Sequence, residues 1–132
     1  MGWRAIEITQ STGAYWEQRA HDLIVSRGAT VIARNYTSRR GEIDLIALDR
    51  GTVAFIEVRY RRRPQFGSAL ASVSLAKQQK VLMTAQAFLL SHHDYCNRYC
   101  RFDIIGFDGR SDSTRAQWLK GAFGSAEYPN YE

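Results

Sequence analysis

The chain has 132 residues, of which 45% are hydrophobic and 23% are charged, and it carries a formal net charge of +5. This composition is ordinary for one globular domain with a single core. No apolar run approaches the ~18 residues that are needed to cross a bilayer, which excludes a membrane-spanning helix.

The first half of the chain predicts one helix followed by three strands. Apolar residues of segment 14–27 recur at helical spacing, and Gly28 would end that helix. Alternating and β-branched residues predict strands at 30–36, 42–48 and 52–60. Because only a short turn separates the last two strands, we expect them to form an antiparallel hairpin.

The second half predicts a long helix over 70–90 and a strand over 101–107. Segment 116–123 is ambiguous, with a last strand as one interpretation. The expected buried face of the long helix consists of Val73, Leu75, Ala76, Leu82, Ala85, Phe88 and Leu89.

The element order αβββαβ predicts one α/β domain over residues 13–123, with a mixed central sheet flanked by helices. Residues 1–12 and 124–132 are expected to be loose termini. The two cysteines, Cys96 and Cys100, have no second pair with which to form a metal motif, so we expect free thiols in a reducing compartment. Because the first residues lack the core of a secretory signal, we expect a cytoplasmic protein.

Three carboxylates lie on the predicted hairpin. Glu42 and Asp44 share one face of the first strand because side chains alternate along a strand, and Glu57 lies on its partner. If the register brings Asp44 opposite Glu57, the two could share Mg²⁺, which accepts one or two carboxylates and keeps several waters. A third acid, Glu17 on the first helix, could reach over the sheet.

Each acid also has a purely structural interpretation. Glu42 follows two arginines and is more often a surface ion pair, and Glu17 alone is more often a solvated helix residue. Asp44 and Glu57 lie within apolar strands, where an unpaired acid is unfavourable to bury, so function is favoured for both.

Basic residues follow the second acidic strand. Arg61, Arg62 and Arg63, with Arg39 and Arg40 from the neighbouring turn, form a predicted phosphate-binding surface. The alternative is a solvated strand end, since many soluble domains carry a similar basic excess.

Taken together, these features resemble the YraN family of predicted endonucleases. The combination of GEIDLI with a following Glu-Val-(Lys or Arg) is highly specific, although either piece alone would be weak. The resemblance covers roughly residues 13–123 and rests on Gly13 with Glu17, Arg34-Asn35, GEIDLI at 41–46, FIEV at 55–58, Lys77 and RFD at 101–103.

The resemblance implies a restriction-endonuclease-like fold related to archaeal Holliday-junction resolvases. Asp44 and Glu57 fall on the two metal-binding acids of the Asp…(Asp/Glu)-x-Lys nuclease motif, and Glu17 falls on a helix acid that assists the metal. Arg59 falls on the lysine; it can hold a phosphate but stays protonated. Lys77 is expected to be one of the nucleic-acid-binding residues. Either Lys77 or Lys80 could also bring an ammonium group to the site.

These observations favour a nuclease that uses Mg²⁺ or Mn²⁺ and acts on DNA rather than RNA, with branched or recombining structures as candidate substrates. The alternative is a non-catalytic nucleic-acid-binding module that keeps the nuclease fold. A third, weaker interpretation is a protein-interaction subunit whose acids cap the sheet. No membrane partner is expected, and a homodimer is an option because junction-cutting relatives must cut two symmetric strands.

Overall fold

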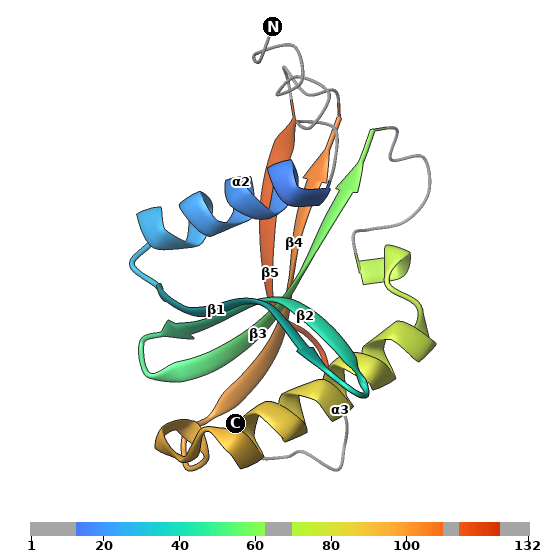
Figure 1. Cartoon of the computed structure of the whole chain (residues 1–132). Coiled ribbons are helices and arrows are strands. Elements are labelled where there is room, and N and C mark those ends of the chain that lie inside the picture. Colours follow the sequence, from blue (N-terminus) through green and yellow to red (C-terminus); the bar gives the residue numbers. More distant parts are fainter. Residues whose placement is uncertain (1–12, 63–69, 110–113, 125–132) are drawn as a thin grey trace, which may run out of the picture.

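The computed structural model describes residues 13–62, 70–109 and 114–124. Within them a five-stranded sheet lies between two helices, α2 (Gly13–Ser26) and α3 (Leu75–Ser91), which cover opposite faces (Figure 1). This confirms the mixed sheet flanked by helices. Residues 1–12 and 125–132, expected to be loose, lie outside the described part of the chain.

The sheet has the order β1-β2-β3-β4-β5. All neighbouring strands are antiparallel except β3 and β4, which are parallel because the chain crosses through α3 between them. The ambiguous segment near residue 120 forms the edge strand β5. The strands are β1 (Thr30–Ser38), β2 (Gly41–Asp49), β3 (Thr52–Arg61), β4 (Cys100–Asp108) and β5 (Arg115–Phe123).

The predicted hairpin is the antiparallel pair β2–β3. Asp49 pairs with Thr52, so the connection is the two-residue turn of Arg50 and Gly51. Both turn residues have positive φ, 55° and 88°, as tight hairpin turns require. The expected hairpin is therefore confirmed.

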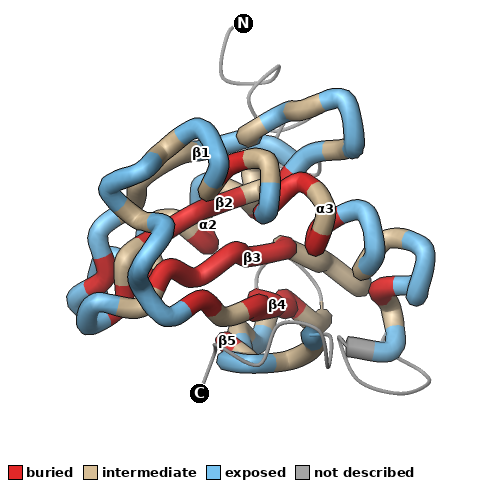
Figure 2. The backbone as a smooth tube through the Cα atoms, turned by 90° about the horizontal axis from the view of Figure 1, so that it is seen from below, coloured by how far each residue is buried: buried red, intermediate tan, exposed pale blue. Residues whose placement is uncertain are grey.

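Each face of the sheet carries its own apolar cluster. On the α2 face, Trp16 and Ile24 pack against Leu45 and Ile56. On the α3 face, Phe88 belongs to the cluster that includes Phe55 and Phe102. Because both faces are covered, the buried segments run through β2, β3 and β4 in the middle of the molecule (Figure 2). None of the described helices is long and apolar enough to cross a membrane.

The start of α3 differs from the prediction of one helix over 70–90. A short 3-10 helix, η1 (Leu70–Ser72), comes first, and α3 begins only at Leu75. Ser74 adopts an extended conformation, and its hydroxyl accepts a hydrogen bond from the backbone N–H of Lys77 at 3.1 Å. The expected burial of Leu75 and Ala76 is wrong: both residues are exposed in the first turn of α3, Leu75 at 78%.

The Ser74 cap generates a prediction about stability. Ser74→Ala leaves the N–H of Lys77 without its partner, so we expect the free energy of unfolding to fall by about 1 kcal/mol. Ser74→Asp restores a capping acceptor and should stay within a few tenths of a kcal/mol of the parent. Urea unfolding measures both, and equal stability of the Ala and Asp variants would contradict the cap.

Candidate active site

The paired strands β2 and β3 separate, and the site lies where they do. Their pairing ends at Leu45 and Ile56. Before Leu45, β2 pairs only with β1, and beyond Ile56, β3 pairs only with β4, which leaves a fork in the sheet (Figure 1). Gly41 lets the β1–β2 arm lie close against α3, since a Cβ there would meet Thr84 Oγ1 at 3.3 Å.

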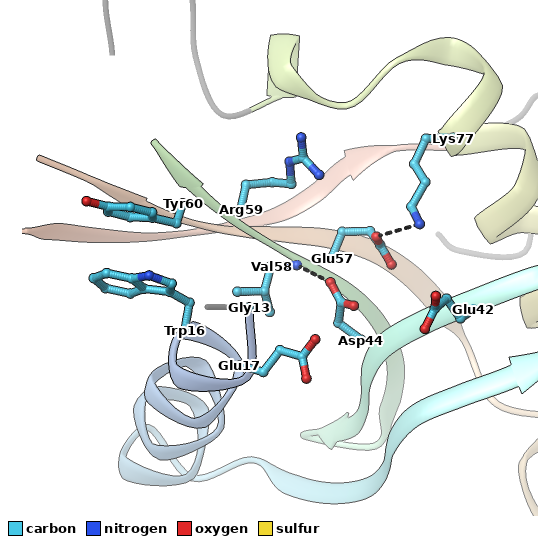
Figure 3. A pocket seen from close by; sticks show the side chains of 10 residues that line it. All are labelled: Gly13, Trp16, Glu17, Glu42, Asp44, Glu57, Val58, Arg59, Tyr60 and Lys77. Atoms are coloured by element: carbon cyan, nitrogen blue, oxygen red, sulfur yellow. Dashed lines mark hydrogen bonds and ion pairs between the residues drawn. The ribbon is translucent and has the colours of Figure 1, made fainter. Parts of the chain in front are cut away.

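A hollow of about 440 Å³ opens in this fork (Figure 3). It receives side chains from α2, from both arms of the fork and from α3. All four predicted catalytic residues line it, although they come from three different elements. The lining consists of Gly13, Trp16, Glu17, Glu42, Asp44, Glu57, Val58, Arg59, Tyr60 and Lys77.

Asp44 and Glu57 meet across the fork. Asp44 Oδ2 accepts a hydrogen bond from the backbone N–H of Val58 at 2.8 Å. The Glu57 carboxylate in turn accepts a hydrogen bond from the backbone N–H of Asp44. The two acids thus bridge the strands where the backbone ladder has stopped. Glu57 is only 2% exposed, and its Oε2 has no hydrogen-bond partner.

Both carboxyl groups hold their protons more tightly than usual. Burial, followed by the neighbouring charge of Asp44, raises the pKa of Glu57 to about 8. Burial also raises the pKa of Asp44 to about 6, against the lowering effect of the Val58 N–H. The charge of Asp44 disfavours ionisation of Glu57, and the charges of Glu17 and Glu42 disfavour ionisation of Asp44, so a cation in the hollow would stabilise the ionised form of both acids.

Two basic residues line the hollow in different ways. Lys77 points at the acids, with its Nζ 3.6 Å from Glu57 Oε1. Arg59 instead extends toward the η1 segment (Figure 3), and its guanidinium donates to the Ser72 hydroxyl at 3.3 Å and to the Ser72 carbonyl at 3.1 Å. Lys80, the other lysine considered from the sequence, is not among the residues that line the hollow.

The remaining acids, Glu17 and Glu42, stand at the walls of the hollow. Glu17 reaches it because α2 is fixed by Trp16, whose ring stacks on Tyr60 with centroids 4.1 Å apart. Glu42 is exposed on the β2 arm. The sequence did not predict this aromatic pair, because residue spacing does not indicate which helix side chain packs on which strand side chain.

The donor set fits a divalent cation held by two carboxylates. Asp44 and Glu57 present oxygens from adjacent strands, and the unpartnered Glu57 Oε2 is a buried acceptor that needs a partner. Mg²⁺ and Mn²⁺ are hard cations that bind such oxygens and complete their shell with water. Among the described residues no three His, Cys, Asp or Glu side chains form a ready metal cluster, although the charge of Glu17 is near enough to raise the pKa of Asp44.

The predicted basic surface is divided. Arg39 and Arg40 are exposed in the β1–β2 turn, and Arg40 Nη1 donates to Met83 Sδ of α3 at 3.2 Å. Arg62 is exposed at the end of β3, but Arg61 forms an ion pair with Asp108 at 3.0 Å, which balances its charge within the protein. The fork separates the two groups, and the last predicted member, Arg63, lies outside the described residues.

A second buried acid has a structural role and offers a comparison. Asp103 is fully buried, but it accepts hydrogen bonds from Arg101, from Trp118 Nε1 and from the backbone N–H of Gly121, each at 2.9 Å. These bonds bridge the irregularity in the β4–β5 pairing beside Asp103. An acid that holds the fold is thus fully satisfied here, whereas Glu57 is not.

Comparisons with known proteins identify relatives. A model of the uncharacterised protein family UPF0102 matches residues 16–107. A UPF0102 protein of Pseudomonas fluorescens is 41% identical over 118 residues, which is 89% of this chain and 96% of the relative. The UPF0102 protein YraN of Escherichia coli O1:K1 is 42% identical over 116 residues, which is 87% of this chain and 86% of that protein. The resemblance to the YraN family is confirmed.

The raised pKa of Glu57 generates a prediction about stability and pH. The pKa rises from an ordinary 4.5 to about 8 on folding, so the parent loses stability as pH rises through this interval. Glu57→Gln removes the ionisation, and we expect it to be more stable than the parent at pH 8 by roughly 2–4 kcal/mol, with a smaller gain at pH 5.

Urea unfolding at the two pH values without divalent cations measures this difference. Asp103→Asn is the control, because it removes the charge of an acid whose partners are all present; it should destabilise the protein at both pH values. A Glu57→Gln variant that is less stable than the parent at pH 8 would contradict the stated cause of the shift.

Proposed function

The chain belongs to the uncharacterised protein family UPF0102, and from the geometry of its site we propose that it is a metal-dependent nuclease that hydrolyses phosphodiester bonds in DNA. Branched and recombining structures are the candidate substrates. Asp44 and Glu57 would hold Mg²⁺ or Mn²⁺, and the substrate would enter the hollow that these residues line.

The buried carboxyl group of Glu57, which lies beside Asp44 and whose Oε2 has no hydrogen-bond partner, carries this proposal. If the two acids served only to cap the separated strands, one neutral acceptor on each strand would be enough. Instead two ionisable groups are buried together, and their mutual repulsion opposes folding. Asp103, by contrast, has hydrogen-bond donors for both of its carboxylate oxygens. Groups held in an unfavourable state inside a pocket are typical of catalytic and binding sites.

The reaction is hydrolysis. The oxygen of a water bonds to phosphorus, the bond from phosphorus to one sugar oxygen breaks, one hydrogen of the water ends on that sugar oxygen, and the other is released as a proton. A divalent cation supplies Lewis-acid polarisation of the phosphoryl oxygen and a lowered pKa of bound water. The protein holds the two carboxylates against their repulsion and brings basic side chains to the phosphate.

One observation favours the alternative of a non-catalytic nucleic-acid-binding module. Arg59 occupies the position of the usual lysine, and its guanidinium donates hydrogen bonds to Ser72 and not to Asp44 or Glu57. Such a module would bind nucleic acid with or without the acids and would cleave none. The same pair of measurements, cleavage and binding on one variant, separates the two functions.

We therefore predict that Glu57→Gln abolishes cleavage and keeps binding. Single-stranded, duplex, flap and four-way-junction DNA are incubated with Mg²⁺ or Mn²⁺, and binding is followed in Ca²⁺. Glu57→Gln removes a metal ligand but no basic residue, so affinity should stay within about threefold while cleavage disappears. Mn²⁺ should also raise the melting temperature of the parent and not of the variant. Cleavage by the variant at the parent rate would assign the activity to another site or a contaminant.

The divided basic surface gives a separate prediction about binding. The double variant Arg39→Ala/Arg40→Ala removes two exposed charges beside the fork, so the slope of log affinity against log salt on duplex DNA should flatten by up to about 1.8. The matched control, Arg27→Ala/Arg98→Ala, removes two exposed charges at the far ends of α2 and of the hairpin. Fluorescence anisotropy at several salt concentrations measures both slopes. Equal slopes for the two double variants would show that the β1–β2 turn does not contact DNA.

A further inference from the structure

The hollow contains two cations, Arg59 and Lys77, and the fold positions them for different tasks. Arg59 comes from β3, two residues after Glu57, and Lys77 comes from the first turn of α3. Only Lys77 forms an ion pair with one of the two central acids. The question is which of them meets the phosphate at which the bond breaks.

We propose that Lys77 is the catalytic cation of this site and contacts the scissile phosphate, while Arg59 holds a neighbouring phosphate of the same strand. This assignment rests on the proposed nuclease function. The ammonium of Lys77 balances the negative charge that develops on the phosphoryl oxygens. The atoms exchanged are those of the hydrolysis above, and no further reactant is needed.

The contacts of Arg59 tie it to η1. Its Nε and Nη2 donate to the hydroxyl and the carbonyl of Ser72, which belongs to η1. The planar guanidinium keeps its remaining donors in a fixed fork, a geometry suited to holding a phosphate that does not move during the reaction. Between Arg59 and Lys77, the ion pair with the central acids is formed by Lys77.

The contact of Lys77 is looser and more central. Its Nζ lies 3.6 Å from Glu57 Oε1, beyond the usual length of a charge-assisted hydrogen bond, and its side chain is 35% exposed. The ammonium can therefore turn from Glu57 to an incoming phosphate without a change of backbone. Its long flexible stem and three rotatable donors suit a group whose charge changes during a reaction.

The position of Lys77 is also unfavourable for the helix that carries it. The first turn of α3 contains no acidic residue, and the only charge there is the cation of Lys77. A cation near a helix N-terminus is repelled by the helix dipole. Ser74 nevertheless fixes Lys77 at this point by capping its backbone N–H. Local helix stability therefore does not explain a lysine at this position, whereas the ion pair with Glu57 does.

The test compares single-turnover cleavage with affinity for the same DNA in Ca²⁺. Lys77→Met keeps the length of the side chain and removes its charge; we expect the rate to fall by about 100-fold or more, with affinity within about threefold. Arg59→Met should chiefly raise KM, because it removes a contact present before and during the reaction. Lys80→Met, the same change one turn along α3 and outside the hollow, should cleave like the parent.

Each result decides between the assignments. Lys77→Met cleaving at the parent rate, with Glu57→Gln inactive, would overturn the role of Lys77 and leave the nuclease function standing. A large fall in rate for Arg59→Met with little effect from Lys77→Met would return the catalytic role to Arg59. A parent that cleaves no DNA in Mg²⁺ or Mn²⁺ would overturn the function and the role of Lys77 together.

Discussion

The separation of β2 from β3 is the constraint on which the candidate site depends. Where two antiparallel strands stay paired, their backbone groups satisfy one another and no side chain is needed between them. Beyond Leu45 and Ile56 this pairing ends, and Asp44 takes over the acceptor role toward the Val58 N–H. The same opening lets α2 and α3, which lie on opposite faces, send residues into one hollow. A continuous sheet would have kept Glu17 and Lys77 apart.

The two buried acid clusters show how one fold treats the same side-chain chemistry in opposite ways. Around Asp103, a guanidinium, an indole N–H and a backbone N–H surround the carboxylate, so burial is compensated. At the fork, the ammonium of Lys77 lies 3.6 Å from Glu57 Oε1, and Glu57 Oε2 has no hydrogen-bond partner. The first cluster is complete without anything from outside, whereas the second leaves one buried carboxyl oxygen without a hydrogen-bond partner. Burial alone would not separate these two roles, whereas the inventory of hydrogen-bond partners does.

The sequence predicted the features that depend on local spacing. The β2–β3 hairpin follows from two alternating runs joined at Arg50 and Gly51, and the meeting of Asp44 with Glu57 follows from its register. The start of α3 was missed although Ser74 is an N-cap signal, because apolar residues on both sides continue the helical pattern. The tether of Arg59 to Ser72 and the pairing of Arg61 with Asp108 join distant segments. No spacing rule reports such contacts, so the sequence predicts one basic surface from the strand end and the neighbouring turn without showing that Asp108 neutralises Arg61.

The unfavourable burial of Glu57 also bears on how such a chain would drift once selection for its chemistry is relaxed. Most substitutions at a buried position weaken a protein, which is why cores change slowly. Position 57 is expected to be an exception, since a neutral side chain of similar shape there removes a buried ionisable group. If Glu57 binds a metal as proposed, stability and activity pull this residue in opposite directions. Among relatives that keep the fold, a neutral residue at this point of β3 would mark a lineage in which the reaction has been abandoned.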